Sequence, residues 1–337
     1  MEDSLTTERD RRIFEEEFSK TLPDRIFDSH VHLIRRSSYP ADFTFGERSY
    51  LKKFNGEFTL DDFRTACREV LPGKEVWAAG FGNPDLHADR SDAAGFGADN
   101  RTVFGLRLVS PVDSVEAVDA DFRKYRLVGL KPYPDLAVPR PGQPVALADF
   151  FSDQQLEYID RRGLVCVIHI PGKERLNSAA TRGQMVELCR KCPAGNFIFA
   201  HIGRAYFLRG VVGLLDELAE CPNAWLDTAM VNHPGVLRYA FDHFPRERIL
   251  FGSDAPISLL HGKSVEINHQ YAYLTDENFD LGTVIYDSSG RVEYTLFLYE
   301  QFRAVLACGL SKRELADFFF QNACDLYRKT AERMFEK

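Results

Sequence analysis

Two histidines, His30 and His32, lie one residue apart in the segment RIFDSHVHL. Residues two apart in an extended strand point to the same side, so the two imidazoles are expected to project together. The apolar Ile26 and Phe27 and the β-branched Val31 favour a strand at this place. Two imidazoles on one strand supply half of a metal site. Taken alone, the triplet is more often formed by core or surface histidines, so the rest of the chain decides its meaning.

Four further polar residues come at the ends of later expected strands: Lys131, His169, His201 and Asp254. Strand alternation places each of them on the same face as residues two and four positions earlier. These face-sharing residues are Gly129 for Lys131, Val165 and Val167 for His169, Phe197 and Phe199 for His201, and Leu250 and Gly252 for Asp254. All of the polar residues are therefore expected to point into one shared site.

Such a set suits a metal-assisted reaction. Catalytic zinc takes nitrogen and oxygen ligands, keeps one position open and lowers the pKa of a water molecule toward neutrality. An aspartate beside the ion can orient that water and take its proton. A histidine that does not bind the ion can polarise a carbonyl group or carry a proton, because its pKa lies near the working pH.

The elements that must position these residues alternate strand and helix. Strands are predicted over 25–31, 75–80, 102–109, 127–131, 164–170, 196–200, 224–228 and 249–252. Helices are predicted over 1–20, 59–71, 114–125, 147–162, 178–191, 208–221, 234–244, 292–309 and 311–334. Eight short apolar strands separated by helices predict an α/β (β/α)8 TIM barrel, whose active site lies at the carboxyl ends of the strands. A doubly wound open sheet is the alternative, although no GxGxxG follows a strand and no P-loop is found.

Two long segments, 33–58 after the first strand and 257–290 after the eighth, are expected to be loops that cover the site. We expect one domain over residues 1–337, with the barrel core at about 25–327. The N-terminal helix and the C-terminal helices account for the remaining length.

Composition limits the classes of function. The chain has 337 residues and a net charge of −8, which argues against nucleic-acid binding. No apolar run is long enough to span a membrane, and the charged N-terminus lacks an apolar signal core. The seven cysteines lack framework spacing, and Cys189 and Cys192 read as structural. We therefore expect free thiols in a cytoplasmic protein that acts on a small molecule.

The remaining histidines leave alternatives open. His233 could reach the site or serve at a helix N-terminus. His261 and His269, with Glu266 between them, could bind a second metal, but a solvated loop is the better interpretation. His87 and His243 are interpreted as non-functional.

The sequence resembles the amidohydrolase superfamily in HVH, in VIH of strand five, in FIFAHIG of strand six and in ILFGSDAP of strand eight. It most resembles the amidohydrolase-related (amidohydrolase 2) branch over about residues 25–327, including QNACDLY near the C-terminus. The resemblance implies His30, His32 and His169 as metal ligands and Asp254 as ligand or proton acceptor. It also implies His201 as the catalytic histidine, and homo-oligomers are common among such proteins.

Two positions depart from the pattern of the family. Relatives often have paired glycines after the histidine of strand six, whereas here Gly203 is followed by Arg204, a residue able to bind a carboxylate or to hold the loop. In two-metal members a carboxylated lysine on strand four bridges both ions, and Lys131 stands at that place. We favour one Zn²⁺ ion, with Lys131 and Arg204 as candidate substrate contacts. Lys131 could instead contact a metal ligand or form a structural salt bridge, and for Arg204 holding the loop is the better interpretation. Mn²⁺, Fe²⁺ and Co²⁺ also suit these ligands.

Three functions follow from this reading. The first is hydrolysis of an amide, lactone or ester of a small anionic molecule. The second is non-oxidative decarboxylation of an aromatic or muconate-type acid on the same scaffold. The third, a non-catalytic sensor or scaffold, is disfavoured because every expected ligand is present.

Overall fold

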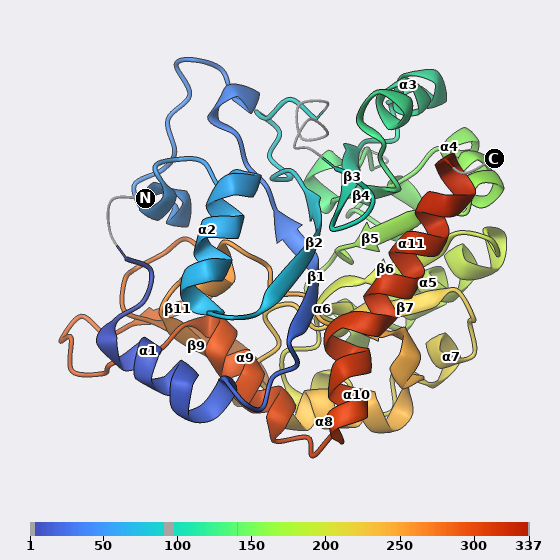
Figure 1. Cartoon of the computed structure of the whole chain (residues 1–337). Coiled ribbons are helices and arrows are strands. Elements are labelled where there is room, and N and C mark those ends of the chain that lie inside the picture. Colours follow the sequence, from blue (N-terminus) through green and yellow to red (C-terminus); the bar gives the residue numbers. More distant parts are fainter. Residues whose placement is uncertain (1–3, 91–97, 140, 336–337) are drawn as a thin grey trace.

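Eight parallel strands follow one another in chain order around a barrel in the computed structural model, which describes residues 4–90, 98–139 and 141–335 (Figure 1). They are β1 (Arg25–His32), β2 (Glu75–Phe81), β3 (Val103–Val109), β4 (Gly129–Pro132), β5 (Val165–Ile168), β6 (Asn196–Phe199), β7 (Ala224–Asp227) and β8 (Ile249–Leu250). The barrel closes where the Ser29 amide donates to the Phe251 carbonyl (3.0 Å) and the Asp254 amide to the His30 carbonyl (2.9 Å). The TIM-barrel prediction is thereby confirmed, and the open doubly wound sheet is wrong.

Helices surround the barrel. They are α1 (Glu8–Ile13), α2 (Leu60–Val70), α3 (Val115–Tyr125), α4 (Asp153–Arg162), α5 (Ala179–Lys191), α6 (Ala200–Arg204), α7 (Asp216–Ala219), α8 (Pro234–His243), α9 (Phe297–Leu306), α10 (Lys312–Ala316) and α11 (Asn322–Phe335), with π-helical turns at Phe14–Phe18 and Asp317–Gln321. Capping residues set several of the starts. Thr59 and Asp62, for example, form a reciprocal capping box at α2.

Four predicted helices differ from the structure. The segment 147–162 forms a 3₁₀ turn, Leu147–Asp149, followed by α4, and the helix predicted over 292–309 begins only at Phe297. Of the segment 1–20, the described residues 4–20 form α1 and the π-helical turn after it. The segment 208–221 is not one helix but a 3₁₀ turn, Leu208–Gly210, followed by the short α7. Gly213 lies between them with a φ of 72°, a left-handed conformation that ends a helix.

The segment 257–290 also differs, because it is not an irregular loop. It forms a second sheet in the order β11-β10-β9, made of β9 (Gly262–Ile267), β10 (Gln270–Thr275) and β11 (Val284–Tyr286). Asn268 and His269 join β9 to β10, and both have positive φ (49° and 59°), as a two-residue hairpin turn requires. This sheet is called the inserted sheet below.

The end of the barrel opposite the site is apolar and closed by the C-terminal helix. Tyr327 of α11 stacks on Phe27 of β1 (ring centroids 5.3 Å apart), and Phe27 stacks on Phe104 of β3 (5.4 Å). Trp77 of β2 meets Phe320 edge-on at 4.9 Å. Helix α11 and the π-helical turn before it contact β1, so the last helix of the chain meets the first strand (Figure 1).

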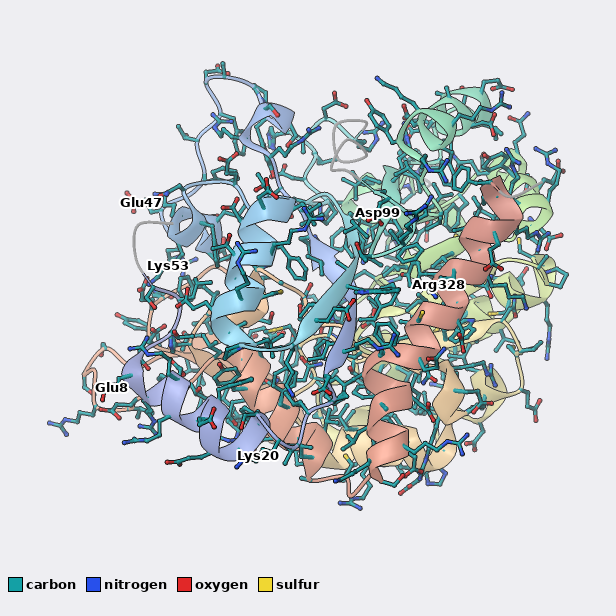
Figure 2. All side chains as sticks on the ribbon, viewed as in Figure 1. Glu8, Lys20, Glu47, Lys53, Asp99 and Arg328 are labelled. Carbon is teal, nitrogen blue, oxygen red and sulfur yellow. The ribbon has the colours of Figure 1, made fainter. Side chains whose placement is uncertain are left out.

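Charged side chains cover the outside of the molecule. Those that Figure 2 labels, Glu8, Lys20, Glu47, Lys53, Asp99 and Arg328, are all exposed. All seven cysteines are free thiols, as expected. Among the described helices, none has the length and apolar character needed to cross a membrane.

Candidate metal centre and its cavity

Strand β1 aims its two histidines through a bulge. The pairing of β1 with β2 shifts register between Asp28 and Val31. Ser29 lies in the bulge, where its hydroxyl donates to the Phe251 carbonyl (2.7 Å) and ties β1 to the loop after β8. Bulges next to active sites commonly redirect side chains. Here the result is that His30 and His32 both line the cavity at the mouth of the barrel.

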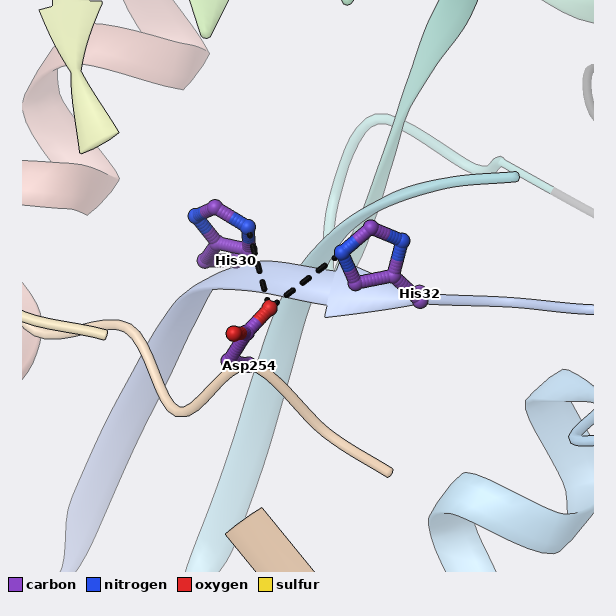
Figure 3. Close-up of side chains that lie close together, drawn as sticks. All are labelled: His30, His32 and Asp254. Carbon is purple, nitrogen blue, oxygen red and sulfur yellow. Dashed lines mark ion pairs between the residues drawn. The ribbon is translucent and has the colours of Figure 1, made fainter. Parts of the chain in front are cut away.

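His30, His32 and Asp254 form a compact cluster, in which one ligand atom from each residue lies within 4.8 Å of the others. Asp254 Oδ1 is 3.3 Å from His30 Nε2 and 3.2 Å from His32 Nε2, and Figure 3 shows the carboxylate between the two rings. Asp254 has a φ of 71°. Gly252 lets the chain that leads to Asp254 pass close to His30, because a Cβ at residue 252 would lie only 2.8 Å from the Cβ of His30.

Hydrogen bonds fix the tautomers of both histidines. His30 Nδ1 donates to the Asp227 carboxylate (2.9 Å), and His32 Nδ1 donates to the Gly82 carbonyl (3.2 Å). Such bonds on one ring nitrogen leave the other nitrogen with a lone pair, as in metal sites whose histidines are oriented by a carboxylate or a carbonyl. Both lone pairs then face Asp254, an arrangement that repels unless a cation lies between the groups.

The directions in which the pKa values of Asp254 and His30 are shifted indicate that the space between these groups favours a positive charge. Burial raises the pKa of Asp254, but His30, His32 and His201 outweigh it and hold that pKa well below its usual value. Burial and Lys131 lower the pKa of His30, yet the carboxylates of Asp227 and Asp254 raise it overall. Without a metal, a proton on His30 relieves the repulsion that a bound cation would otherwise relieve.

Asp227, at the end of β7, was missed by the sequence analysis. It is fully buried. Its Oδ2 accepts from His30, and its Oδ1 accepts from the backbone amides of His201 (2.8 Å) and Ala229 (3.1 Å). The available signal was its position in AWLDT, a polar residue ending the seventh strand like the others. Asp227 thus couples His30 to the turn that carries His201.

His201 reaches the cavity by a route that strand alternation does not predict. Phe197 and Phe199, expected to share its face, pack in the outer layer with the helices, whereas Ile198 and Ala200 lie inside the barrel. The prediction that they share a face was therefore wrong. The chain leaves the strand geometry at His201, where four successive residues of the range 201–204 have φ between 52° and 61°. Left-handed conformations of this kind are costly and concentrate at functional sites.

The imidazole of His201 lies 5.0 Å from that of His30 between ring centroids. Its Nδ1 donates to the Ala229 carbonyl (2.8 Å), which leaves Nε2 unprotonated. Burial lowers the pKa of His201 to about 4, although Asp254 opposes the shift. His201 is therefore neutral at pH 7 and able to accept a proton at Nε2.

His169 and Lys131 line the same cavity but lie outside the compact cluster. The ring of His169 is 5.3 Å from that of His201, and burial, with His201, holds its pKa well below the usual value. Lys131 Nζ lies 4.5 Å from the centroid of the Phe81 ring, and burial lowers the pKa of Lys131 to about 8. Neither His169 Nδ1 nor Lys131 Nζ has a hydrogen-bond partner among the described residues. Unpaired buried polar atoms indicate a place for a ligand or ion, so the residues present fit a bound metal.

Arg204 lines the cavity and also holds a loop. Its Nη1 donates to the carbonyls of Ile170 (3.0 Å) and Gly172 (3.3 Å), in the loop after β5. Its Nε is buried and has no partner among the described residues. The loop-holding alternative is therefore present in the structure, and the unpaired Nε remains as a donor for a ligand.

The cavity has a volume of about 690 Å³. Its polar lining residues described above, His30, His32, Lys131, His169, His201, Arg204 and Asp254, are called the polar cluster below. Five tyrosines also line the cavity: Tyr50, Tyr133, Tyr206, Tyr271 and Tyr273. Burial raises the pKa of Tyr50, Tyr133, Tyr206 and Tyr273, so their phenols stay neutral. Tyr271 and Tyr273 come from the inserted sheet. The cavity therefore combines a basic, metal-suited floor with walls that offer aromatic faces and hydroxyl groups.

The remaining histidines have structural partners. His233 caps α8, where its Nδ1 accepts from the amides of Gly235 (3.1 Å) and Val236 (3.3 Å). His261 Nε2 pairs with the buried Asp10 at 2.8 Å. Across the described ranges, only His30, His32 and Asp254 gather three ligand atoms, so the second metal site considered at His261, Glu266 and His269 is not formed.

Comparison with known proteins agrees with this architecture. A sequence model of the family described as Amidohydrolase matches residues 27–329. A search of curated proteins found no significant match. Among solved structures, amidohydrolase 2 from Bifidobacterium longum subsp. infantis is 17% identical with a TM-score of 0.55, and the match covers 90% of this chain and 99% of that chain.

Two further similar structures carry different activities in their names. 4-Oxalomesaconate hydratase from Rhodopseudomonas palustris is 16% identical (TM-score 0.54; 92% of this chain and 96% of that chain). 5-Carboxyvanillate decarboxylase from Sphingomonas paucimobilis is 14% identical (TM-score 0.56; 91% of this chain and 99% of that chain). At such identities the likeness supports the fold alone.

Proposed function

This chain belongs to the amidohydrolase family, and we propose that it is a metal-dependent hydrolase of a small anionic amide, lactone or ester. His30, His32, His169 and Asp254 are the proposed ligands, and one Zn²⁺ ion is the favoured metal. The main support is the arrangement of His30 and His32, whose lone pairs both face the ionised Asp254 at 3.2–3.3 Å. That arrangement is favourable only with positive charge between the groups.

A divalent ion at this place supplies Lewis acidity and makes water a stronger acid. The protein's own groups do the rest. Asp254 orients the attacking water toward the carbonyl carbon of the substrate and takes a proton from it as the new carbon–oxygen bond forms. His201, neutral with a free Nε2, receives that proton from Asp254 and delivers it to the leaving oxygen or nitrogen as the bond from that atom to the carbonyl carbon breaks. Asp227 holds His30 and the turn of His201 in fixed relation.

The preference for an anion rests on two cations. Lys131 Nζ and Arg204 Nε are buried and have no hydrogen-bond partner among the described residues. A carboxylate on the substrate would pair with Lys131 and release the cost of a buried lone charge. Below a pH of about 8, the pKa to which burial lowers Lys131, the amine carries that charge.

Metal content and mutagenesis test the proposal together. Elemental analysis of wild type and Lys131→Ala is expected to give about one metal equivalent per chain in both proteins. His30→Ala is expected to lose the metal and the hydrolysis of any confirmed substrate, whereas His243→Ala, an exposed histidine on α8, keeps both. If His30→Ala retains hydrolysis, the assignment is wrong. About two equivalents in wild type, falling in Lys131→Ala, point instead to a carboxylated, bridging Lys131.

Decarboxylation of an aromatic or muconate-type acid is the second candidate. The five tyrosines of the cavity favour it, because neutral aromatic rings pack well against a planar acid. Release of CO₂ from a panel of such acids, with no ester, lactone or amide hydrolysis, would replace the first proposal by this one.

A further inference from the structure

The wall of the cavity on the side of the inserted sheet contains a short stack of aromatic and cationic groups. The rings of Tyr206 and Tyr271 lie 4.5 Å apart between centroids. The guanidinium carbon of Arg175 lies 4.5 Å from the Tyr271 centroid and 5.6 Å from the Tyr206 centroid. Arg175 Nη2 also donates to the Tyr271 hydroxyl at 3.3 Å. Three residues from three separate segments thus meet at one wall.

Arg175 is held for this contact. It lies in the loop after β5 with a φ of 56°, a left-handed conformation that is uncommon for arginine. The Arg175 Nε is buried without a partner among the described residues. The hydrogen bond of this guanidinium group to a side chain is the one that Nη2 donates to Tyr271. A cation near two tyrosine rings restrains both of them through cation–π attraction. Arg175 does not itself line the cavity, whereas Tyr206 and Tyr271 do.

The inserted sheet is anchored to the barrel and to the N-terminal helix. His261, directly before β9, pairs with Asp10 of α1. Within β9, the amide of Ser264 donates to Asn232 Oδ1 (3.1 Å), and Glu266 accepts from the amide of Leu208 (3.0 Å). These contacts hold the strand beside β10, which carries Tyr271 and Tyr273.

We propose that Tyr271, braced by Arg175 and Tyr206, is a specificity-determining residue that sets the size of the group the pocket accepts. The proposal rests on the proposed use of this cavity as the substrate site. Because the ring is fixed by a stack and by an anchored sheet, it acts as a preformed wall. Removing it enlarges the cavity at this wall and removes no member of the His30, His32 and Asp254 cluster.

Two carboxylates of different size test the proposal without turnover. Calorimetry gives the dissociation constants of benzoate and 2-naphthoate for wild type and Tyr271→Ala. Wild type is expected to prefer benzoate, and the variant to shift the ratio toward 2-naphthoate by about tenfold, the scale of discrimination by pocket size. Tyr271→Phe keeps the ring and is expected to keep the wild-type ratio. Arg175→Met removes the guanidinium group that restrains the Tyr271 ring. Its ratio of dissociation constants is expected to fall between those of wild type and Tyr271→Ala.

Tyr286→Ala is the matched control, because Tyr286 lies on β11 of the same sheet, is 45% exposed and does not line the cavity. Should Tyr271→Ala not fold, Tyr271→Leu replaces it. Equal ratios in wild type and variant overturn the proposal, as does the absence of binding of either acid to both proteins. Metal content and the hydrolysis panel are read separately, so failure of the proposed chemistry is distinguished from failure of this wall.

Discussion

The two ends of the barrel are built from the same eight strands but differ in kind. At the end closed by α11, aromatic side chains such as Phe27, Phe104 and Tyr327 are fully buried and packed ring to ring. At the mouth, charged groups such as Asp254 and Lys131 are buried, and the backbone at Asp254 and in 201–204 is left-handed. Apolar packing stabilises the first end, whereas the second end retains features that cost stability. In barrels of this kind, the carboxyl end serves chemistry and the opposite end serves stability.

Asp254→Asn tests the mouth with the largest expected effect. Asparagine keeps the size of the side chain but loses the negative charge that binds a cation and the ability to take a proton from water. The kcat/KM for a confirmed substrate is expected to fall about 10²- to 10⁴-fold, the usual contribution of an acid–base group. Circular dichroism is expected to show the fold intact. If the fold is lost with the activity, the mouth also carries stability and the contrast between the ends fails.

Phe104→Ala tests the opposite end. Phe104 lies on β3, is fully buried and is not a member of the polar cluster. Its loss is expected to lower the free energy of unfolding by about 3–5 kcal/mol, measured by urea denaturation, while metal content per folded chain stays unchanged. Phe104→Leu should lose less. A drop in metal content in either variant would show that the two ends are coupled.

Lys131→Met tests whether the mouth costs stability. Burial lowers the pKa of Lys131 to about 8 from an unfolded value of 10.5. Between these values the unfolded chain binds more protons, so stability rises with pH, and the penalty is fully present below about pH 8.

Metal-free Lys131→Met is therefore expected to exceed wild type in unfolding free energy at pH 7 by a few kcal/mol, on the order of 1.4 kcal/mol per pKa unit. The difference should shrink as the pH approaches 10. Lys20→Met, at an exposed site, is the control for replacing a lysine by methionine and should leave the unfolding free energy at pH 7 nearly unchanged. A constant difference for Lys131→Met across this range would contradict the ionised state of Lys131.

Asp227→Asn has the smallest expected effect. It tests the hydrogen bond between His30 Nδ1 and the Asp227 carboxylate. An amide in place of the carboxylate no longer favours the His30 tautomer that directs Nε2 toward Asp254. Metal affinity is expected to fall about 10- to 100-fold, measured by chelator competition. Asp280→Asn, an exposed carboxylate at the rim, should not change it. Equal affinities in wild type and Asp227→Asn would mean that the tautomer is fixed by other groups.

Much of the architecture was predictable from the sequence, because each strand of the barrel is a short apolar run and several helices, such as α2, α3 and α4, begin at a recognisable capping residue. The inserted sheet could have been predicted from alternation in QYAYLT and the turn at Asn268 and His269, two features that sequence analysis did not weigh against a loop. Asp227 could have been found by applying to the seventh strand the rule that selected His169 and Asp254.

The sequence by itself determined the barrel, the site at the carboxyl ends of its strands and the residue types that meet there, since these follow from hydrophobic periodicity and from polar residues at strand ends. Only the tertiary structure decided how the side chains turn. The bulge at Ser29 aims His30, and the left-handed turn brings His201 inward although Phe197 and Phe199 face outward. It also brought Tyr271 to Arg175, nearly a hundred residues away. Such contacts depend on strand register and on backbone conformations that the surrounding packing enforces, and a local pattern of residues does not contain that information.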